Sequence, residues 1–290
     1  MKLKKISKQY GKKTVLKEIN TEIGHGIYGL LGANGAGKST LMKIMIGEVK
    51  ESSGKIIYEN ENNSQESFFS TLGYLPQNFR APKEMKVFDY LRYVAVYKGI
   101  KDEKIKANIQ ELCQDLNLSD YIQNRIGDLS GGTLQRVGIA QAFLGNPSFI
   151  ILDEPSSGLD ISERRNLKEF ISRKSRDKSI IISTHIISDI EYIVDHLLII
   201  KTGRILQDIS YKEAMKSLDG CVWEDYLNNE QITHGEKLIQ SMGGVTTNLD
   251  REDNSRNHIR YVGKEKLTNK SVHKEPELND FYLWTIEGGR

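Results

Sequence analysis

Residues 27–40 decide the fold, and they read Ile27-Tyr28-Gly29-Leu30-Leu31-Gly32-Ala33-Asn34-Gly35-Ala36-Gly37-Lys38-Ser39-Thr40. The segment opens with an apolar run typical of a buried strand, and helical spacing begins at Lys38. Between the two, residues 32–39 fill every fixed position of the pattern G-x-x-x-x-G-K-[ST]. Because that pattern requires a strand before it and a helix after it, the segment predicts a phosphate-binding loop.

The residue types of this loop suit a nucleotide phosphate. Glycines let backbone N–H groups curve around a phosphate, and the helix N-terminus adds unpaired donors. Lys38 would place a charge at the β- and γ-phosphates, and the Ser39 hydroxyl would be a ligand of Mg²⁺. GTPases, kinases and ATPases share such loops, but the chain lacks a guanine-reading Asn-Lys-x-Asp motif, since the close match at residues 269–272 has no Asp. We expect nucleotide contacts from Gly32, Ala33, Asn34, Gly35, Ala36, Gly37, Lys38, Ser39 and Thr40.

A second apolar run, residues 149–152, is followed directly by Asp153 and Glu154. Such a run predicts a buried strand, and ligands of an open α/β sheet bind at the carboxyl ends of its strands. Asp153 is suited to hold Mg²⁺, directly or through water. Glu154 points elsewhere, because it is one residue on, and we predict that it polarises an attacking water as a general base.

The surrounding pattern predicts an α/β fold with a mostly parallel sheet. Further short β-branched and aliphatic runs at residues 73–75, 179–183 and 197–201 predict buried strands. Helical spacing predicts helices at residues 38–46, 87–98, 102–116, 132–144 and 162–174. The first 25 residues differ, and their turns at Gly11 and Gly24 predict antiparallel strands beside the main sheet.

Composition excludes several classes of protein. The chain has 290 residues with 41 basic and 39 acidic side chains, a balance that argues against bulk nucleic-acid binding. Two cysteines leave no Cys-rich zinc site or disulfide framework, so a reducing compartment fits best. A signal peptide has an apolar run after its basic start, and the basic start of this chain is not followed by such a run. No apolar run approaches the roughly 18–20 residues that span a bilayer.

From Asp219 the sequence changes in character, and residues 219–290 carry more acidic than basic side chains. Gly243, Gly244 and the polar run at residues 246–257 predict a loop or linker. Residues 276–290 hold an apolar cluster in an otherwise polar tail, which predicts docking either on the chain's own domain or on a partner.

Residues 129–136 read Leu-Ser-Gly-Gly-Thr-Leu-Gln-Arg and resemble the signature motif of the ATP-binding cassette (ABC) family, Leu-Ser-Gly-Gly-Gln. The segment lies 23 residues before Asp153, as the family's spacing implies, and it departs from the motif at Thr133. It offers a second phosphate-ready helix N-terminus, which one nucleotide hardly needs from the same molecule. The resemblance implies that Ser130, Gly131 and Gly132 close over a nucleotide held by the phosphate-binding loop of a second cassette.

Other positions extend the resemblance in the family's order. Tyr10 resembles the aromatic residue that stacks on adenine, and Gln77 the glutamine that contacts Mg²⁺ and senses the γ-phosphate. Asp160 ends a Ser-Gly-Leu-Asp segment that resembles the D-loop, which couples the two sites. His185 resembles the switch histidine that contacts the γ-phosphate. Glu154, His185, Gln77 and Lys38 are therefore the predicted catalytic residues, and Ser39, Gln77 and Asp153 the predicted metal ligands.

The resemblance covers residues 1–218 and implies a P-loop NTPase core with an N-terminal antiparallel β subdomain and an inserted α-helical subdomain at about residues 78–147. Residues 219–290 would be a small C-terminal extension with a regulatory or docking role. The implied cofactors are ATP and Mg²⁺. The implied partners are a second copy of the chain or a paralogous cassette, and an integral-membrane permease, with no nucleic acid. Such a subunit would hydrolyse ATP in the cytoplasm, on the inner face of the cell membrane.

Two further features concern the branch of the family and its alternatives. The D-loop at residues 157–160 and the ending at residues 275–283 resemble the branch of antibiotic, bacteriocin and multidrug exporters. The alternative is an ABC ATPase that acts on ribosomes or nucleic acid, but such members carry two cassettes or long coiled coils. Here 92 residues without a heptad run separate Lys38 from Ser130. A non-hydrolytic regulatory module is a third possibility, against which the intact Glu154 and His185 argue.

Overall fold

The computed structural model describes residues 1–58, 65–253 and 256–288. The chain divides into two compact units, Met1–Asp208 and Ile209–Arg290. This division falls shortly before residue 218, where the sequence places the end of the cassette; the domain roles remain predictions.

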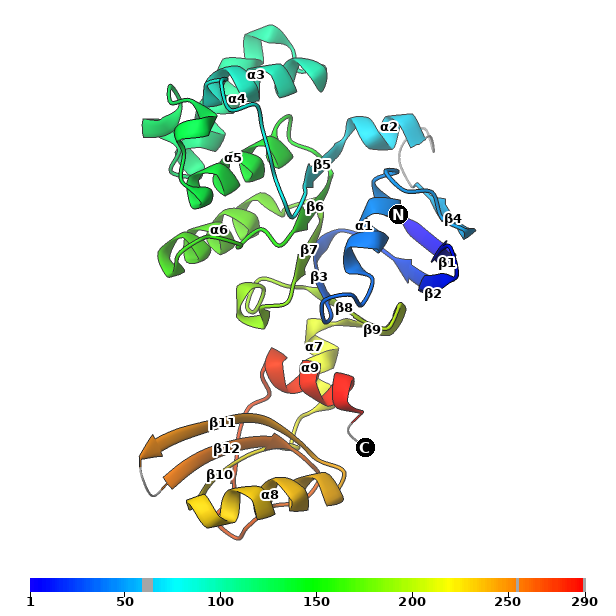
Figure 1. Ribbon diagram of the computed structural model, residues 1–290, viewed down its shortest axis with the longest axis vertical. Helices are drawn as coiled ribbons and strands as arrows, with labels where there is room; N and C mark the ends of the chain where they lie inside the picture. The colour runs from blue at the N-terminus through cyan, green and yellow to red at the C-terminus, as the bar shows by residue number, and fades with distance from the viewer. Residues whose placement is uncertain (59–64, 254–255, 289–290) are drawn as a thin grey trace. The chain divides into compact units, whose positions relative to one another are not determined.

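A six-stranded sheet forms the centre of the first unit (Figure 1). Its strands lie in the spatial order β5 (Leu72–Leu75), β6 (Phe149–Asp153), β7 (Ser179–Thr184), β3 (Gly26–Leu31), β8 (His196–Lys201) and β9 (Arg204–Ser210). The pairs β5–β6, β6–β7, β7–β3 and β3–β8 are parallel. Residues 149–152 and 180–182 are buried, which explains why these strands read as continuous apolar runs. Each buried Ile or Leu side chain contributes about 1.5–3 kcal/mol.

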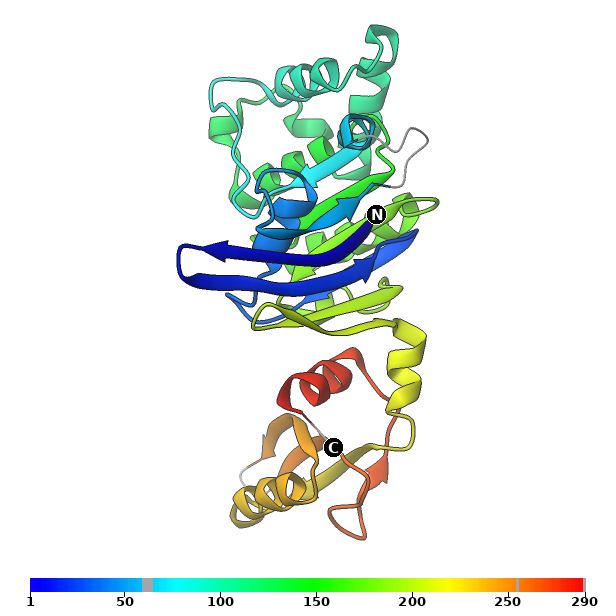
Figure 2. The ribbon, with the colours of Figure 1, turned by 90° about the vertical axis from the view of Figure 1, so that its right-hand side faces the viewer.

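Helices cover one face of this sheet, and a smaller sheet covers the other (Figures 1 and 2). On the first face lie α5 (Gly131–Phe143) and α6 (Ile161–Lys174). On the second lie α1 (Lys38–Met45), α2 (Gln65–Ser70) and the antiparallel strands β2 (Lys13–Glu22), β1 (Lys2–Tyr10) and β4 (Ser53–Ile57). Apolar side chains from β1, β2 and α1 share one core with those of β3, β6 and β7. The predicted α/β class and N-terminal antiparallel strands are confirmed.

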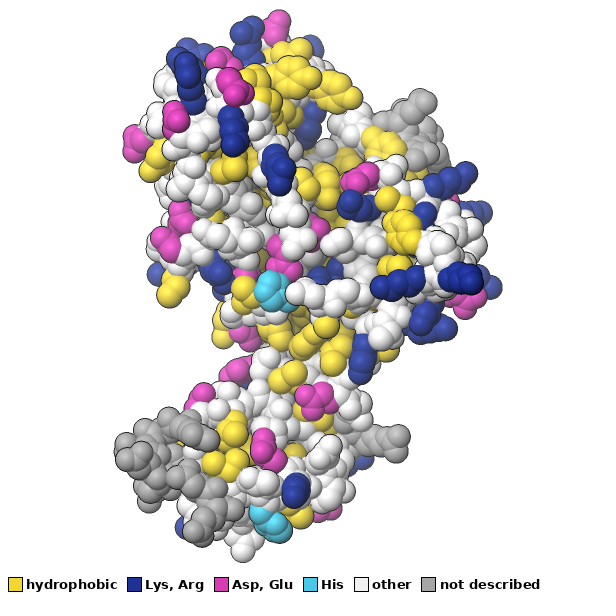
Figure 3. All heavy atoms as spheres, in the orientation of Figure 1, with side chains coloured by type: hydrophobic (Ala, Val, Ile, Leu, Met, Phe, Trp, Pro, Cys, Tyr) yellow, Lys and Arg dark blue, Asp and Glu magenta, His cyan; other side chains and the backbone are white. Residues whose placement is uncertain are grey.

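A helical region follows β5 in the chain. It consists of α3 (Val87–Tyr97), α4 (Asp102–Asp115), two short 3-10 turns, η1 (Ser119–Tyr121) and η2 (Ile126–Asp128), and then α5. On α3, Val87, Leu91 and Ala95 recur every four residues and are buried, so one stripe of the helix packs inward. Figure 3 shows hydrophobic side chains gathered over the outer part of this region. The exposed fractions there are 64% for Tyr93, 54% for Val96 and 85% for Tyr97.

The second unit is a four-stranded antiparallel sheet with helices. The strands lie in the order β11 (Val245–Asp253), β12 (Arg256–Val262), β10 (Val222–Leu227) and β13 (Val272–His273). Its helices are α7 (Tyr211–Ser217), α8 (Asn229–Ser241) and α9 (Leu278–Glu287). Ile239 of α8 packs with Leu227, Ile259 and Tyr261 in the core of this unit. The tail helix α9 buries Leu278 and Phe281 and packs on β11 and β12, so the predicted tail cluster docks within its own unit.

The prediction of a loop at residues 246–257 is wrong for the residues of this segment that the structure describes. Residues 246–253 belong to β11, and β12 begins at Arg256; residues 254 and 255 lie outside the described residues. The strand β11 pairs with β12 from Val245 opposite Val262 to Asp253 opposite Arg256. Because the partner strand supplies the buried Ile259 and Tyr261, a strand forms here without a strongly apolar pattern of its own.

Candidate nucleotide-binding site

The glycine-rich loop lies between β3 and α1, as predicted. A Cβ atom on Gly32 would lie 2.4 Å from the carbonyl oxygen of Ile200, so this position has no room for a side chain. Gly37 has a φ of 115°, in the region that favours glycine, and it directly precedes the helix. The turn therefore brings the backbone donors of the loop to the N-terminus of α1, where a phosphate group is favoured.

Lys38 is held inside this loop. Its ammonium group donates to the Gly32 carbonyl at 2.6 Å and to the Ala33 carbonyl at 3.4 Å. Burial lowers the pKa of Lys38, and the negative charges of Glu154 and Asp153 oppose that effect. The ammonium group is therefore held by two loop carbonyls, and an anionic phosphate at the loop would give it a charged partner.

Asp153 ends β6 as a buried carboxylate. The Ser183 hydroxyl of the neighbouring strand β7 donates to Asp153 Oδ1 at 2.7 Å. Burial raises the pKa of Asp153; hydrogen bonds from Ser183 and Ser39 oppose the rise, and the charge of Glu154 adds to it. The raised pKa means that burial disfavours the charged carboxylate more than its hydrogen bonds favour it. A cation bound beside Asp153 would favour the charged form.

Glu154 and His185 are in direct contact. His185 Nδ1 lies 2.9 Å from Glu154 Oε1, and the glutamate side chain is buried while the histidine is exposed. Glu154 has a φ of 51°, which is uncommon for a residue with a side chain. Its N–H donates to the Ser183 carbonyl at 2.9 Å. This backbone conformation is strained, and it persists only where surrounding contacts hold it.

Lys38, Asp153 and Glu154 line a cavity of about 600 Å³, whereas His185 does not line it and reaches it only through its contact with Glu154. The predicted residues that line it are Asn34, Gly35, Gly37, Lys38, Ser39, Thr40, Gln77, Asp153 and Glu154. The sequence analysis missed Lys13, Thr14, Val15, Lys17 and Thr202, which line it too. The sequence signal that could have indicated Lys13 and Lys17 is the concentration of lysines at residues 12–17, where β2 begins. Two added positive charges make the cavity better suited to a polyphosphate.

Other predicted residues lie beside the cavity or apart from it. Gly32, Ala33 and Ala36 belong to the loop itself, and Tyr10 is 47% exposed opposite Lys13 in the β1–β2 pairing. Residues 130–132 and Asp160 do not line the cavity. Ser130 caps α5 by accepting from Thr133 N–H, and Asp160 caps α6 by accepting from Glu163 N–H. The structure therefore brings the loop, Gln77, Asp153 and Glu154 together and leaves the signature segment elsewhere.

Gln135 is a further residue that the sequence analysis did not single out. Its side-chain amide, buried in α5, donates to the carbonyl oxygens of Glu154 and Pro155, both at 3.2 Å. The signature helix thereby contacts the backbone that carries the catalytic candidate Glu154. Its position in the Leu-Gln-Arg segment, two residues after Thr133, was the available signal.

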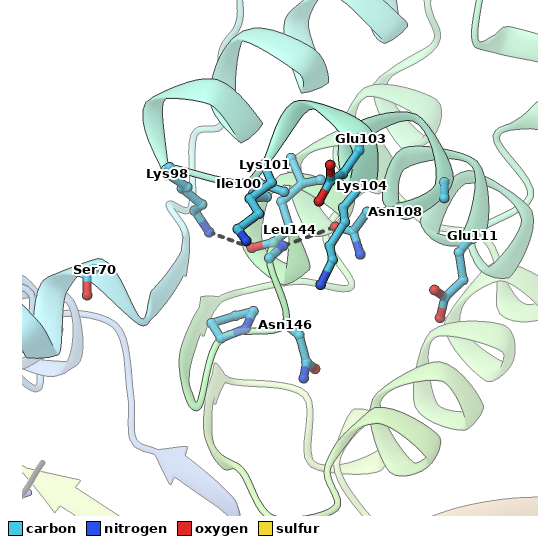
Figure 4. A pocket seen from close by; sticks show the side chains of 14 residues that line it. Ser70, Lys98, Ile100, Lys101, Glu103, Lys104, Asn108, Glu111, Leu144 and Asn146 are labelled. Carbon is cyan, nitrogen blue, oxygen red and sulfur yellow. Dashed lines mark hydrogen bonds between the residues drawn. The ribbon is translucent and has the colours of Figure 1, made fainter. Parts of the chain in front are cut away.

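A larger cavity, of about 660 Å³, lies in the helical region (Figure 4). It is lined by the α3–α4 turn, the start of α4 and residues 144–147, which precede β6. Lys98 donates to the Leu144 carbonyl at 3.1 Å there and so caps the end of α5. No predicted site residue lines this cavity, and it borders the N-terminal end of β6 rather than the carboxyl end where Asp153 lies.

The fold and the site define a nucleotide-binding cassette, and comparisons with known proteins agree. Residues 16–157 match the family described as ABC transporter. The chain is 34% identical over 234 residues to a lantibiotic transport ATP-binding protein of Streptococcus pyogenes, covering 80% of this chain and 97% of the relative. It is 31% identical over 287 residues to a Nod factor export ATP-binding protein of Rhizobium sp., covering 96% and 94%. A solved ATP-binding subunit of an ABC transporter matches with a TM-score of 0.69 at 26% identity, covering 75% of this chain and 92% of that one.

The chain belongs to the ABC transporter family. It is an ATP-binding subunit and ATPase of that family. These comparisons give no support to the ribosome or nucleic-acid alternative. In the part of the chain that the structure describes, no helix is both long and apolar enough to cross a membrane.

Proposed function

We propose that this chain powers an exporter, with two cassettes closing around two ATP molecules and driving a separate membrane permease. The observation that carries this proposal is the separation of two phosphate-ready helix N-termini. The loop before α1 lines the cavity with Asp153 and Glu154, whereas Ser130 at the start of α5 does not line it. Each N-terminus offers donors to a phosphate, so a second chain can supply the signature segment to the loop of the first.

The residues of the cavity fit Mg²⁺. The candidate ligands are the Ser39 hydroxyl, the Asp153 carboxylate and the Gln77 amide, all of them oxygen donors of the kind that Mg²⁺ prefers. The raised pKa of the buried Asp153 supports this assignment, because a cation beside the carboxylate would stabilise its charged form. When bound, Mg²⁺ would neutralise charge on the β- and γ-phosphates.

The protein groups around the γ-phosphate then have separate tasks. Lys38 binds the phosphates, with Lys13 and Lys17 adding positive charge at the cavity wall. Glu154 accepts a proton from the attacking water. His185 orients the glutamate carboxylate through the 2.9 Å contact between Nδ1 and Oε1. With Nδ1–H donating to Glu154, Nε2 can also donate to a phosphate oxygen when the ring carries both protons. Tyr10 stacks on adenine from the β1–β2 turn.

The permease would dock on the helical region. Tyr93, Val96 and Tyr97 form an exposed apolar group on α3, on the face opposite its buried stripe. Large exposed apolar groups of this kind mark interaction surfaces. The localisation follows from this contact: the subunit would be peripheral on the cytoplasmic face of the membrane.

The exporter class rests on relatives that match most of this chain. One relative is named for lantibiotic transport and the other for Nod factor export, which are quite different molecules. We therefore propose an exporter of peptide, antibiotic or drug type, with the permease choosing the substrate. The second unit, Ile209–Arg290, would be a regulatory or docking extension of the cassette.

The experiment for this proposal combines deletion with complementation. Deleting the gene in its own host should abolish an export activity that the wild-type gene restores and Lys38→Ala does not. The purified chain should hydrolyse ATP with a requirement for Mg²⁺. Intact export in the deletion strain, or full ATPase activity in Lys38→Ala, would contradict the proposal.

A further inference from the structure

Between the N-termini of α5 and α6 runs a chain of side-chain hydrogen bonds that the family resemblance does not assign. It begins at Ser130, continues through Thr133 and Arg136, and reaches Glu163 and the Asp160 turn. We propose that Thr133, Arg136 and Glu163 are positioning residues: they set the Ser130 hydroxyl as a donor to phosphate and couple it to the D-loop. This inference rests on the proposed function, in which Ser130 contacts the ATP of a second cassette.

The hydrogen-bond partners of the Ser130 hydroxyl allow an orientation that suits a phosphate. Arg136 Nη2 donates to Thr133 Oγ1 at 3.2 Å, and Thr133 Oγ1 lies 2.8 Å from Ser130 Oγ. Either oxygen of this pair could donate to the other, and we take the threonine hydroxyl as the donor to Ser130 Oγ, with the Thr133 oxygen accepting from the guanidinium. That oxygen also accepts from Thr133 N–H at 3.1 Å. Both lone pairs of Ser130 Oγ are then used, so its own hydrogen is directed outward, as an anionic phosphate oxygen requires.

The threonine is suited to this task by its burial. Thr133 is 4% exposed and is the residue at which the chain departs from the Leu-Ser-Gly-Gly-Gln signature. A short, β-branched side chain has few rotamers, so its hydroxyl stays between Ser130 and Arg136. At this position, where the chain departs from the signature, the threonine hydroxyl therefore supplies a polar contact to Ser130 and Arg136.

Arg136 fixes the middle of the chain of bonds. Its Nη1 donates to the Leu116 carbonyl at 3.0 Å and to the Asn117 carbonyl at 2.7 Å, at the end of α4. Its Nη2 lies 3.2 Å from Glu163 Oε1, and both side chains are less than a quarter exposed. A guanidinium held on three sides has little freedom to turn, so a shift at Thr133 is transmitted to Glu163.

Glu163 connects this arrangement to the D-loop. Its Oε2 accepts from Asp160 N–H at 3.1 Å, and its own N–H donates to Asp160 Oδ1 at 2.8 Å, which is a capping box. The two turns also touch sterically: a Cβ on Gly132 would lie 3.0 Å from the Gly158 carbonyl and 3.1 Å from Glu163 Oε2. The signature turn and the D-loop are therefore expected to move as one body when a second cassette approaches.

The test uses ATP-driven dimerisation of the full chain in a Glu154→Gln background, where hydrolysis is blocked. We expect Thr133→Val to raise the ATP concentration needed for half-dimerisation by about tenfold, the effect of one misdirected hydrogen bond to a charged group. Thr133→Ser keeps the hydroxyl and should rescue dimerisation. Glu163→Gln should weaken it, while Glu169→Gln should not, because the pair of Glu169 with Arg165 on the same helix is exposed. Light scattering against ATP concentration measures the dimer.

Two readouts separate positioning from folding and from the proposed function. Binding of a fluorescent ATP analogue to the monomer should be the same in all variants; a parallel loss in Thr133→Val would mean a structural role and overturn the inference. Because Thr133 and Glu163 both contact Arg136, their double variant should lose less than the sum of the single losses. Full additivity overturns the coupling to the D-loop, and an unshifted Thr133→Val overturns the whole inference; neither result contradicts the proposed function. If Glu154→Gln itself forms no ATP-dependent dimer, the proposed function fails as well.

Discussion

His185 Nδ1 lies 2.9 Å from Glu154 Oε1, so the residue that follows β7 holds the carboxylate that follows β6. The contact joins two neighbouring parallel strands at their carboxyl ends, beside the cavity that Lys38 and Gln77 line. The contact holds the glutamate carboxylate, which in the proposed function accepts a proton from water.

Glu154→Gln should separate binding from hydrolysis. The amide oxygen can still accept from His185, so the local geometry is kept, but the amide cannot accept a proton from water. We expect kcat for ATP to fall by about 10²–10⁴-fold, the usual contribution of a general base, with ATP affinity of the monomer unchanged. Steady-state ATPase assays and nucleotide titration measure the two effects. Turnover at the wild-type rate would remove Glu154 from the catalytic role.

The raised pKa of Asp153 predicts how Mg²⁺ activation depends on pH. Mg²⁺ binds the charged carboxylate, so its affinity should fall as the pH decreases through the pKa, at a higher pH than for an ordinary aspartate. Ser183→Ala removes a hydrogen bond that favours the charged form and should move this loss to still higher pH. Mg²⁺ titrations of ATPase activity from acidic to neutral pH test both statements. Identical pH profiles for Ser183→Ala and the wild type would contradict them.

The second unit should be sensitive to the loss of one buried arginine. Arg260 pairs with Asp280 at 2.7 Å and with Glu224 at 2.9 Å. Arg260→Leu leaves the buried Asp280 without its arginine, removes one of the partners of Glu224, and should cost about 3–5 kcal/mol in the free energy of unfolding. Lys274→Leu, which removes a 44% exposed lysine from the same network, should cost less than about 1 kcal/mol. Urea denaturation followed by tryptophan fluorescence reports on this unit, because Trp223 and Trp284 both lie in it.

The same network predicts the acid stability of this unit. Burial raises the pKa of Glu224, but hydrogen bonds from Lys274, His258 and Arg260 outweigh it and hold the pKa at about 2. A depressed carboxyl pKa stabilises the folded state above the pKa of the unfolded chain, and the contribution disappears as the pH falls from the ordinary value of 4.5 toward 2. Tryptophan-monitored urea titrations at several pH values should show this loss. Glu224→Gln should flatten it, and a slope equal to that of the wild type would contradict the assignment.

The exposed group on α3 predicts a separation of transport from ATP hydrolysis. Replacing both Tyr93 and Tyr97 with Ala should prevent co-sedimentation with membranes of the host and abolish export, since the docking surface is lost. ATP binding should persist, because neither residue lines the nucleotide cavity. Leu206→Ala, an exposed apolar side chain on β9, is the matched control and should leave sedimentation unchanged. Normal export by the double variant would move the permease contact elsewhere.

Local sequence patterns predict most of the first unit and much of the site. The loop at residues 32–39 and the strand ending in Asp153 and Glu154 are each specified by adjacent residues, and the structure places them at one cavity. Lys13 and Lys17 were not predicted there, because strand β2 reaches the cavity only through tertiary packing. The strand β11 was also missed, since its stability depends on pairing with β12 rather than on its own apolar pattern.

The central claim is that two chains share each ATP site, and mixing two inactive variants tests it most directly. Lys38→Ala has a defective loop with an intact signature, and Ser130→Arg has the reverse. Random pairing makes about half of the dimers mixed, and each mixed dimer has one intact site of two, so about a quarter of wild-type ATPase activity should return. If both segments served the same nucleotide within one chain, the mixture would remain as inactive as either variant alone, and that result would contradict the account.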